Sequence, residues 1–364
     1  MHEKYMKLAL DLAERAAGRT SPNPLVGAVV IKDGQIVGRG YHRKAGTPHA
    51  EINAMQEAGD AARGATLYVT LEPCSHFGRT PPCSEAVIKA GIAEVYVAME
   101  DPNPLVAGRG IKQMEKAGIK VCVGLLEDRA KLANEVFIKY ITSRQPFVLL
   151  KTAMTLDGRI AAKTGHSKWV TGPDAREKVH RLRNRYDAVL VGVNTVITDD
   201  PALTCRLPEG GRDPIRIILD SRARIPADSR VLIQDSDAPT YIVVTDRAPV
   251  SKIKTLAKGK AKIVRAEADK HGRVDLRDLM LKLGEMEITG LLVEGGAEVA
   301  ASFFEAGLVD KVLSFIAPKI IGGSDAPGPV GGAGRKSMEE AVHLRGVNFG
   351  QAGDDFFIEG YPEY

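Results

Sequence analysis

Hydrophobic and polar positions along the chain follow two alternating patterns. Short runs rich in Val, Ile and Leu predict strands, and the stretches between them place apolar residues at helical spacing. In the first part of the chain, β-rich runs at 25–31 and 35–38 flank Asp33-Gly34, a pair typical of a hairpin turn. Three further strands are expected there, at 66–71, 94–99 and 120–123.

Helices are expected between these strands. The N-terminal segment predicts an amphipathic helix that buries Met6 and Leu10. A second helix is expected from Pro48 to about residue 58, with Thr47 as its N-cap. The remaining helical patterns run over 82–90, 111–117 and 127–141. Strands separated by helices predict a largely parallel sheet that is covered on both faces.

The segment Ser143-Arg144-Gln145-Pro146 interrupts the pattern, and we expect two domains, over 1–145 and 146–364. A second alternating series follows. Its strands are expected at 147–153, 188–193, 215–220, 240–244, 262–264, 291–293 and 312–316. Its main helices are expected at 173–185, 276–284 and 298–306, and a glycine-rich loop at 322–334. Both halves are therefore predicted to be α/β.

Composition narrows the class of protein. The chain has 50 basic and 46 acidic residues, and a net charge of +4 gives no indication of a nucleic-acid-binding surface. No apolar run comes near the roughly 18 residues needed to span a bilayer. Four cysteines among 364 residues cannot form a disulfide framework, which favours a reducing cytoplasm. We therefore expect a cytoplasmic protein with no nucleic-acid or membrane partner.

His49, Cys74 and Cys83 form the clearest chemical pattern in the chain, together with Glu51. One imidazole and two thiolates suit a catalytic zinc, which keeps its fourth position for water. Glu51 would then transfer protons between that water and a leaving amine. We expect His49 and Cys83 in the first turns of two helices and Cys74 after a strand, so that the three side chains converge end-on.

A structural zinc site is the competing interpretation. It would need a fourth ligand, such as His42 or His76, and it would have no use for Glu51. The observed set is similar to the H-x-E and P-C-x-x-C motifs of zinc-dependent nucleobase deaminases. It departs from them because eight residues, rather than two, separate Cys74 from Cys83.

The longer segment between Cys74 and Cys83 limits the resemblance to one family of these deaminases. The segments HAE, TLEPCSHFGRTPPC and DPNPLVAGRG resemble the pyrimidine deaminase half of the bifunctional deaminase/reductase family of riboflavin biosynthesis. The resemblance implies a cytidine-deaminase-like three-layer α/β/α fold, zinc on His49, Cys74 and Cys83, and proton transfer by Glu51. It also implies hydrolytic removal of the 2-amino group of a diaminopyrimidinone ribosylamine 5′-phosphate.

Four further residues are candidates for contact with that substrate. Asn23 and Asn103 each lie in a Pro-Asn-Pro loop, where a restrained backbone can aim an amide at a pyrimidine edge. The same tripeptide also suits a plain turn. Arg79 is a candidate phosphate contact or an ordinary solvated side chain, and His42 is a substrate contact or a hairpin-end histidine.

The second half has no G-x-G-x-x-G after its first strand, so a standard dinucleotide-binding fold is not predicted. A strand, a glycine turn and a helix nevertheless run through 291–297, and Gly295-Gly296 would let a pyrophosphate come close to the helix start. Ser221 and Arg222 follow another strand and suit an adenosine 2′-phosphate, which favours NADPH over NADH. Both features would also fit plain turns.

Several stretches between Leu150 and Gly323, among them LKTAMTLDGRIA, TGHSKWVTG and LLVEGGAEVAASFFEAGLVD, resemble the reductase half of the same family. The resemblance implies a dihydrofolate-reductase-like α/β fold and hydride transfer from NADPH to the ribose C1′, which gives a ribityl side chain. It places NADPH contacts on Ala153, Trp169, Thr195, Asp199, Ser221, Gly296, Ala297, Glu298, Val299, Ala300, Ala301 and Ser302. It places substrate contacts on Ser167, Arg183, Leu203, Arg206 and Glu294.

Four of the residues in this half also have a physical interpretation. Arg183 and Arg206 would supply paired forks for the substrate phosphate. Trp169 would lie flat beside a cofactor ring, or pack in a core as a lone tryptophan usually does. Lys151, on a predicted strand, would hold a substrate oxygen or donate a proton as the ribose opens.

We therefore expect a bifunctional homo-oligomeric enzyme with zinc and NADPH as cofactors and a small pyrimidine ribotide as substrate. Two alternatives remain open. One is a nucleoside or tRNA deaminase with a degenerate second domain, which for tRNA should show a basic stripe. The other is a zinc-stabilised ligand-binding module. Glu51 separates the two interpretations, because an enzyme needs this carboxylate for proton transfer and a binding module does not.

Overall fold

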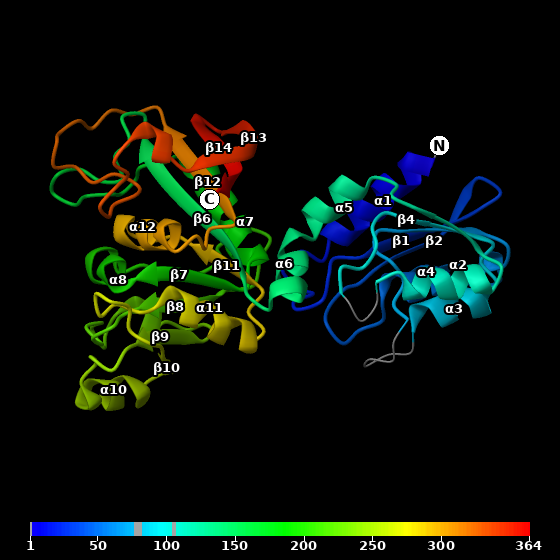
Figure 1. Ribbon diagram of the computed structural model, residues 1–364, viewed down its shortest axis with the longest axis horizontal. Coiled ribbons are helices and arrows are strands. Elements are labelled where there is room, and N and C mark those ends of the chain that lie inside the picture. Colours follow the sequence, from blue (N-terminus) through cyan, green and yellow to red (C-terminus); the bar gives the residue numbers. More distant parts are fainter. Residues whose placement is uncertain (1, 76–81, 104–106) are drawn as a thin grey trace. The chain divides into compact units, whose positions relative to one another are not determined.

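The computed structural model describes residues 2–75, 82–103 and 107–364. The chain divides into two compact units, Met1–Arg144 and Gln145–Tyr364, each built on one sheet (Figure 1). No helix in the described ranges is long and apolar enough to cross a membrane.

The first unit contains a mixed sheet in the order β2-β1-β3-β4-β5. Strand β1 is antiparallel to both β2 and β3, whereas β3, β4 and β5 run parallel. The hairpin expected at Asp33-Gly34 is therefore confirmed, with positive φ at both residues. The expected largely parallel sheet holds from β3 to β5, whereas both pairs that β1 makes are antiparallel. The strands are β1 (Gly27–Lys32), β2 (Gln35–Tyr41), β3 (Thr66–Val69), β4 (Glu94–Val97) and β5 (Lys120–Val123).

Helices cover both faces of this sheet. Figure 1 shows α2, α3 and α4 on one face and α1 and α5 on the other. The helices are α1 (His2–Glu14), α2 (Ala50–Ala58), α3 (Cys83–Ala90), α4 (Arg109–Lys116), α5 (Glu127–Ala133) and α6 (Glu135–Ser143), with a 3₁₀ turn η1 at Gly59–Ala62. A Cβ at Gly40 of β2 would lie 2.2 Å from the carbonyl oxygen of Ala50, so glycine there lets the start of α2 pack directly on the strand.

Two helix boundaries differ from the prediction. Helix α2 begins at Ala50 with His49 as N-cap, because the hydroxyl of Thr47 donates to the carbonyl oxygen of Lys44 (2.7 Å) in a preceding turn. The single helix expected over 127–141 is divided at Asn134. The buried amide of Asn134 pairs with the backbone N–H and C=O of Leu25 at 2.8 and 3.0 Å, which fixes the loop that contains Asn23.

The second unit contains a larger sheet in the order β10-β9-β8-β7-β11-β6-β12-β14-β13. Its strands from β10 to β12 in that order are parallel, and each expected strand of this half is present. These strands are β6 (Phe147–Thr155), β7 (Ala188–Gly192), β8 (Ile215–Leu219), β9 (Thr240–Val244), β10 (Ala261–Arg265), β11 (Gly290–Val293) and β12 (Lys311–Ala317). The antiparallel hairpin β13 (His343–Ala352) and β14 (Asp355–Glu363) was not predicted, because β13 is largely exposed and has no run of apolar residues.

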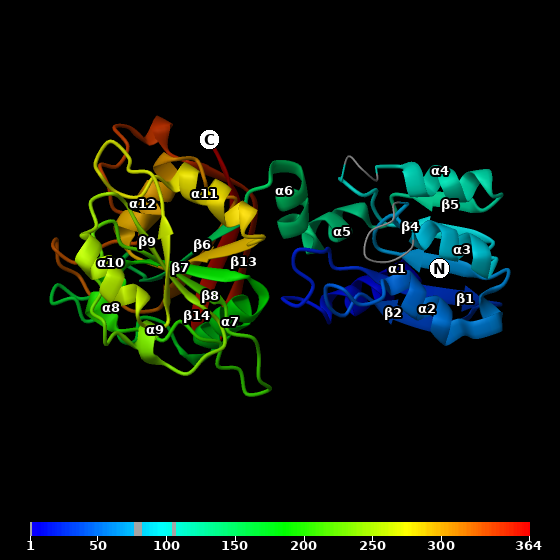
Figure 2. The same cartoon turned by 90° about the horizontal axis from the view of Figure 1, so that it is seen from below.

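Helices α11 and α12 pack together on this sheet (Figure 2), where Leu283 and Phe303 join Val148 and Leu150 of β6 in one core cluster. Alternation along β6 then directs Lys151 to the opposite face. The helices of the unit are α7 (Pro173–Arg185), α8 (Val193–Asp199), α9 (Arg230–Ile233), α10 (Val250–Ala257), α11 (Leu276–Glu285) and α12 (Ala297–Glu305), with a 3₁₀ turn η2 at Met338–Glu340. Because β6, β7, β8 and β11 are parallel, their carboxyl ends meet at one edge of the sheet.

Candidate active sites

His49, Cys74 and Cys83 come together at one point in the first unit. Nδ1 of His49 lies 3.1 Å from Sγ of Cys83 and 3.7 Å from Sγ of Cys74. The three potential ligand atoms all lie within 4.8 Å of one another. Cys83 is the first residue of α3 and Cys74 lies on the segment after β3, but His49 is the N-cap of α2 rather than part of its first turn.

The electrostatics of this cluster fit a zinc ion. A hydrogen bond from the side chain of Cys83 is the largest cause that lowers the pKa of Cys74 to about 4, and the backbone N–H of Cys83 also donates to Cys74 Sγ (3.3 Å). The hydrogen bond with Cys74 raises the pKa of His49. An imidazole and two sulfur atoms are the donor set of a catalytic zinc site, and no fourth ligand joins them in the described part of the chain.

Glu51 lies on α2, two residues after His49, and it is buried at 3% exposure. Its Oε2 atom has no hydrogen-bond partner among the described residues. Burial raises the pKa of this carboxyl to about 7. A buried carboxylate oxygen without a partner costs stability, and its presence here fits a group held for proton transfer to a ligand.

Two of the substrate candidates, Asn23 and His42, meet beside the cluster. Nδ2 of Asn23 lies 3.1 Å from Nε2 of His42, whose Nδ1 lies 3.3 Å from the carbonyl oxygen of Pro48. The rings of His42 and His49 pack edge to face with centroids 5.2 Å apart. Both ring nitrogens of His42 therefore have polar neighbours, and His42 is not among the three residues whose ligand atoms converge. Arg79, the candidate phosphate contact, and His76 lie outside the described residues.

Glu72 organises the loop that holds Asn103, and no sequence pattern pointed to this role. Its buried carboxylate accepts four backbone N–H groups, listed here with their distances: Asp101 (3.2 Å), Gly108 (2.9 Å), Gly110 (2.9 Å) and Ile111 (3.2 Å). Asp101 in turn accepts the backbone N–H of Asn103 at 2.9 Å. In the sequence, Glu72 is recognisable only as an acidic residue directly before Pro73-Cys74. That position does not indicate that its carboxylate binds a distant loop.

We expect Glu72→Gln to lower the free energy of unfolding of the first unit by about 2–4 kcal/mol, because an amide NH₂ would face two backbone N–H donors. The displaced loop should also raise the KM of the deamination that the sequence resemblance implies. Urea unfolding and steady-state kinetics measure the two effects. The matched control is Glu100→Gln, an exposed neighbour that should change stability by less than about 0.5 kcal/mol. Equal behaviour of the two variants would contradict this role of Glu72.

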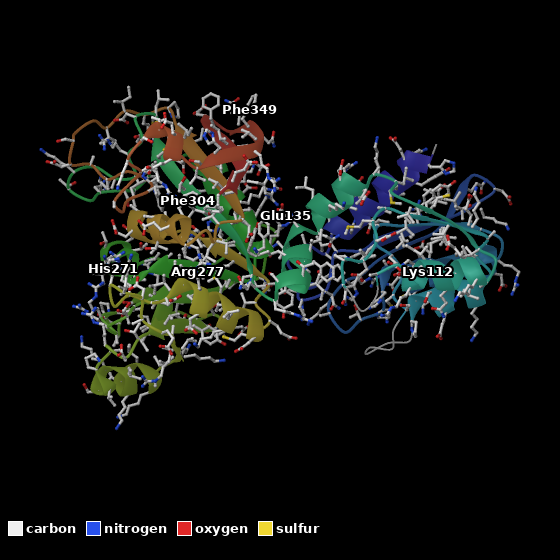
Figure 3. The ribbon with its side chains drawn as sticks, viewed as in Figure 1. Lys112, Glu135, His271, Arg277, Phe304 and Phe349 are labelled. Atoms are coloured by element: carbon white, nitrogen blue, oxygen red, sulfur yellow. The ribbon has the colours of Figure 1, made fainter. Side chains whose placement is uncertain are left out.

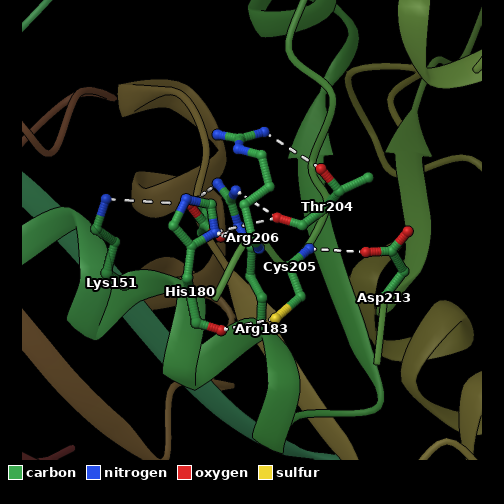
Figure 4. Close-up of polar contacts among 8 residues, drawn as sticks. Lys151, His180, Arg183, Thr204, Cys205, Arg206 and Asp213 are labelled. Atoms are coloured by element: carbon green, nitrogen blue, oxygen red, sulfur yellow. Dashed lines mark hydrogen bonds and ion pairs between the residues drawn. The ribbon is translucent and has the colours of Figure 1, made fainter. Parts of the chain in front are cut away.

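The second unit has a pocket lined by residues of β6 and α7, of the segment after β11 and of the start of α12. Figure 4 draws the polar contacts of several of its lining residues, among them Lys151, Arg183 and Arg206. Ten of the predicted contact residues line it: Lys151, Ala153, Ser167, Trp169, Arg183, Arg206, Glu294, Gly296, Ala297 and Ala300. Four of its lining residues, Lys151, Arg176, Arg183 and Arg206, are cations, against the single carboxylate of Glu294. Such a lining favours an anionic ligand.

A largely buried ion pair, with side-chain exposures of 12% for Arg183 and 6% for Glu294, forms the floor of this pocket. Arg183 donates from Nε and from its terminal nitrogen to the two carboxylate oxygens of Glu294, at 2.6 and 2.9 Å. Nζ of Lys151 lies 4.0 Å from the same carboxylate. Burial acts to raise the pKa of Glu294, but Arg183 and then Lys151 outweigh it, so that the pKa is lowered. We expected the guanidinium groups of Arg183 and Arg206 to bind a phosphate together. The guanidinium of Arg183 is not free for this, because it is bound to Glu294.

The glycine turn after β11 holds the backbone close to β7 and to the start of α12. Gly296 is the N-cap of α12 with φ of 76°, a conformation that favours glycine, and a Cβ at Gly295 would lie 2.8 Å from Val191 of β7. Backbone N–H groups at the start of α12 are thus available to an anion. The other predicted contacts on α12 differ in their surroundings. Ala300 and Ala301 are buried, and Val299 faces Gly192. Glu298 forms an exposed ion pair with Arg273, and its carbonyl oxygen accepts the hydroxyl of Ser302.

Ser167 and Asp199 lie in contact, although one was expected to bind substrate and the other the cofactor. The hydroxyl of Ser167 donates to Asp199 Oδ1 at 3.2 Å. Asp199 ends α8, and Thr195 on the same helix faces Gly296, where a Cβ would lie 3.6 Å from its hydroxyl oxygen. This contact joins the expected substrate and cofactor positions at the end of β7.

Trp169 does not pack in a core: it is 61% exposed, and Arg176 lies over its ring at 4.8 Å.

Ser221 and Arg222 follow β8 at the same sheet edge. The hydroxyl of Ser221 accepts the backbone N–H of Val274 (3.1 Å), and the side chain of Arg222 is exposed. Leu203 is buried, has φ of 53° and does not line the pocket.

Known proteins match both halves of the chain. The family model described as the RibD C-terminal domain matches residues 146–358, and the cytidine and deoxycytidylate deaminase zinc-binding region matches residues 1–99. The riboflavin biosynthesis protein RibD of Aquifex aeolicus is 47% identical over 98% of this chain and 97% of its own length. The protein of the same name from Escherichia coli is 42% identical over 97% of each chain.

Solved structures are also similar to the chain over its full length. The structure of Acinetobacter baumannii RibD has a TM-score of 0.88 at 37% identity and covers 100% of this chain and 99% of that one. A diaminohydroxyphosphoribosylaminopyrimidine deaminase/5-amino-6-(5-phosphoribosylamino)uracil reductase from Thermotoga maritima has a TM-score of 0.86 at 39% identity, over 100% of this chain and 99% of that chain. These matches span both units, which removes the alternatives of a degenerate second domain and of a non-enzymatic binding module. The chain belongs to the RibD family, the bifunctional deaminases and reductases of riboflavin biosynthesis.

Proposed function

We propose that the two steps take place at the two sites described above. The first unit would remove the 2-amino group of a diaminopyrimidinone ribosylamine 5′-phosphate at His49, Cys74 and Cys83, with Glu51 as the proton carrier. The second unit would then reduce the ribosyl group of the product to ribityl with NADPH, in the pocket floored by Arg183 and Glu294. The observation that best supports this proposal is the buried Oε2 of Glu51, which has no hydrogen-bond partner in the described ranges. Glu51 lies at the start of α2, whose N-cap His49 is one of the three converging metal donors.

In the deaminase step, His49, Cys74 and Cys83 would hold the ion, with His42 orienting the imidazole. Zinc, when bound, supplies the Lewis acidity that lets water ionise near neutral pH. Glu51 would accept the proton of the attacking water and give it to the departing amine, because its buried carboxyl has a pKa close to neutrality. Asn23, held beside His42, and Asn103, in the loop bound by Glu72, would contact the pyrimidine edge.

In the reductase step, NADPH supplies the hydride and the protein aligns the two reactants. The amide groups at the start of α12, Thr195 and Asp199 would hold the cofactor, and Trp169 would lie beside one of its rings. Ser221 and Arg222 would bind the adenosine 2′-phosphate, which the exposed guanidinium of Arg222 suits. The side chain of Lys151 is 14% exposed, and its partial burial lowers its pKa, so it is suited to give a proton to the ribose oxygen as the ring opens.

The compartment and the assembly also belong to this proposal. Cys74, Cys83, Cys122 and Cys205 are all free thiols, which suits the reducing cytoplasm. Phe349 on β13 is 80% exposed and its ring points away from the ribbon (Figure 3). An exposed aromatic residue on a sheet edge is a feature of interaction surfaces, and it supports assembly with a second copy.

Product analysis tests the proposed sequence of steps. Purified protein incubated with the diaminopyrimidine ribotide alone should yield a compound in which an amino group has been replaced by oxygen, with the ribosyl group intact. Addition of NADPH should yield the ribityl compound, with two more hydrogen atoms, as identified by mass spectrometry. A reduced product that still carries both amino groups would contradict the proposed order.

A further inference from the structure

His180 lines the same pocket, and none of the steps above uses it. It lies on α7, one turn before Arg183, and its imidazole stands among Lys151, Arg183 and Arg206 in Figure 4. Its Nδ1 atom has two neighbours of opposite kind. The carbonyl oxygen of Thr204 lies 3.2 Å away and the backbone N–H of Arg206 lies 3.3 Å away.

The two neighbours of Nδ1 match two charge states of the ring. A neutral imidazole with its proton on Nε2 accepts the backbone N–H of Arg206 through Nδ1. A protonated imidazole instead donates from Nδ1 to the carbonyl oxygen of Thr204 and keeps a second N–H, on Nε2, for a ligand. The backbone around Thr204 and Arg206 can therefore satisfy either state of His180.

The charges that face His180 come from every element around it. Arg183 lies on α7, Arg206 on the segment before β8, Lys151 on β6 and Glu294 after β11. The carboxylate of Glu294 is engaged by Arg183 on both oxygens, so it offsets only part of the positive charge. Burial, then Arg183 and Arg206, lower the pKa of His180, and the free protein therefore holds the ring neutral near pH 7.

We propose that His180 is a phosphate-binding residue, which together with Arg206 holds the 5′-phosphate of the substrate and takes up a proton from solvent when that phosphate enters. Arg206 is suited to the same ligand because, within the described ranges, its guanidinium hydrogen-bonds only to the hydroxyl of Thr204 (3.2 Å), whereas the guanidinium of Arg183 is bound to Glu294. A dianionic phosphate beside the ring reverses the local field and stabilises the imidazolium. The inference rests on the proposed function, since it requires that this pocket binds the phosphorylated sugar.

The sign of the pH dependence follows from this proton uptake. Binding of the phosphate raises the pKa of His180 from its lowered value in the free protein. The complex therefore binds one more proton than its free components at any pH between the two pKa values. Affinity for the phosphate is greatest on the acidic side of that window and falls with rising pH, by up to about ten-fold per pH unit.

Titration calorimetry with ribose 5-phosphate as the probe tests this directly. At about pH 7.5 a phosphate monoester is already a dianion, so proton uptake measured in buffers of different ionisation enthalpy comes from the protein. We expect the wild-type chain to take up a substantial fraction of a proton. His180→Gln, which can still donate a hydrogen bond but cannot become charged, should take up none and bind about ten-fold more weakly.

His343→Gln is the matched control, because His343 is an exposed histidine on β13, and it should behave as the wild type. Deaminase activity and NADPH binding of His180→Gln confirm that the variant is folded, and the wild-type titration needs no variant. Binding without proton uptake in the wild type, or unchanged uptake in His180→Gln, would overturn the proposal and leave the proposed function intact. Failure of the wild type to reduce the deaminated ribotide with NADPH would instead contradict the proposed function.

Discussion

Glu51→Gln is expected to lower the deaminase kcat by about 10²–10⁴-fold, the usual contribution of a positioned proton-transferring group. The variant should still hold one zinc ion per chain, because His49, Cys74 and Cys83 are unchanged. It should also reduce substrate that has been deaminated beforehand, since the pocket of the second unit contains none of these residues. Metal analysis and separate assays of the two steps measure these results.

The same substitution should not weaken the fold. The Oε2 atom of Glu51 has no hydrogen-bond partner among the described residues, and burial of the carboxyl raises its pKa to about 7. Gln removes the buried charge without removing a hydrogen bond at that atom, so the Tm should be unchanged or higher. Loss of activity without loss of stability is the behaviour expected of a residue held for chemistry.

Glu57→Gln is the control for this experiment. Glu57 lies on the same helix, is exposed and forms only a 3.7 Å surface ion pair with Arg39. We expect its deaminase rate to match the wild type. A deaminase rate of Glu51→Gln within a few-fold of the wild type would remove Glu51 from the mechanism, and loss of both activities would contradict two independent sites.

Glu294→Gln should have the largest effect on the second unit. It leaves the guanidinium of Arg183 and the ammonium group of Lys151, 12% and 14% exposed, without a counter-charge. Breaking a buried pair costs about 3–5 kcal/mol of unfolding free energy, and we expect the low end of that range for this largely buried pair. Reduction should be lost because both cations are displaced from the pocket floor. Deamination should persist. Denaturant unfolding followed in the second unit, together with the two assays, measures this.

The control for Glu294 is Glu177→Gln on α7. Glu177 forms an exposed pair with Arg181 at 2.7 Å, and pairs of this kind contribute less than about 1 kcal/mol. Reductase activity should be unchanged in this variant. If Glu294→Gln were as stable and as active as Glu177→Gln, the ion pair would have no part in shaping the pocket.

The sequence predicted those features that are local or that recur as spaced motifs. The alternation of apolar runs indicated the α/β class of both units, and the positions of His49, Cys74 and Cys83 at element ends indicated one metal site. The parallel strands of the second half were predicted for the same reason: each is a short apolar run between turn residues.

Features that depend on distant partners were not predictable. Glu72 binds backbone groups of a loop that no periodicity links to it, and Asn134 divides a predicted helix because its amide pairs with Leu25. Arg183 was assigned to a phosphate, but its fork faces Glu294, 111 residues away along the chain. Patterns of residue type do not encode such pairings, because a guanidinium fits a carboxylate and a phosphate equally well.

Zinc K-edge X-ray absorption of the purified full-length chain tests the central claim most directly. The account predicts one zinc per chain, with two sulfur ligands at about 2.3 Å and a single imidazole nitrogen at about 2.0–2.1 Å, the remaining position being taken by a solvent oxygen. Addition of a pyrimidine product should perturb only that oxygen. A zinc with four protein ligands, or a spectrum without sulfur, would contradict the account.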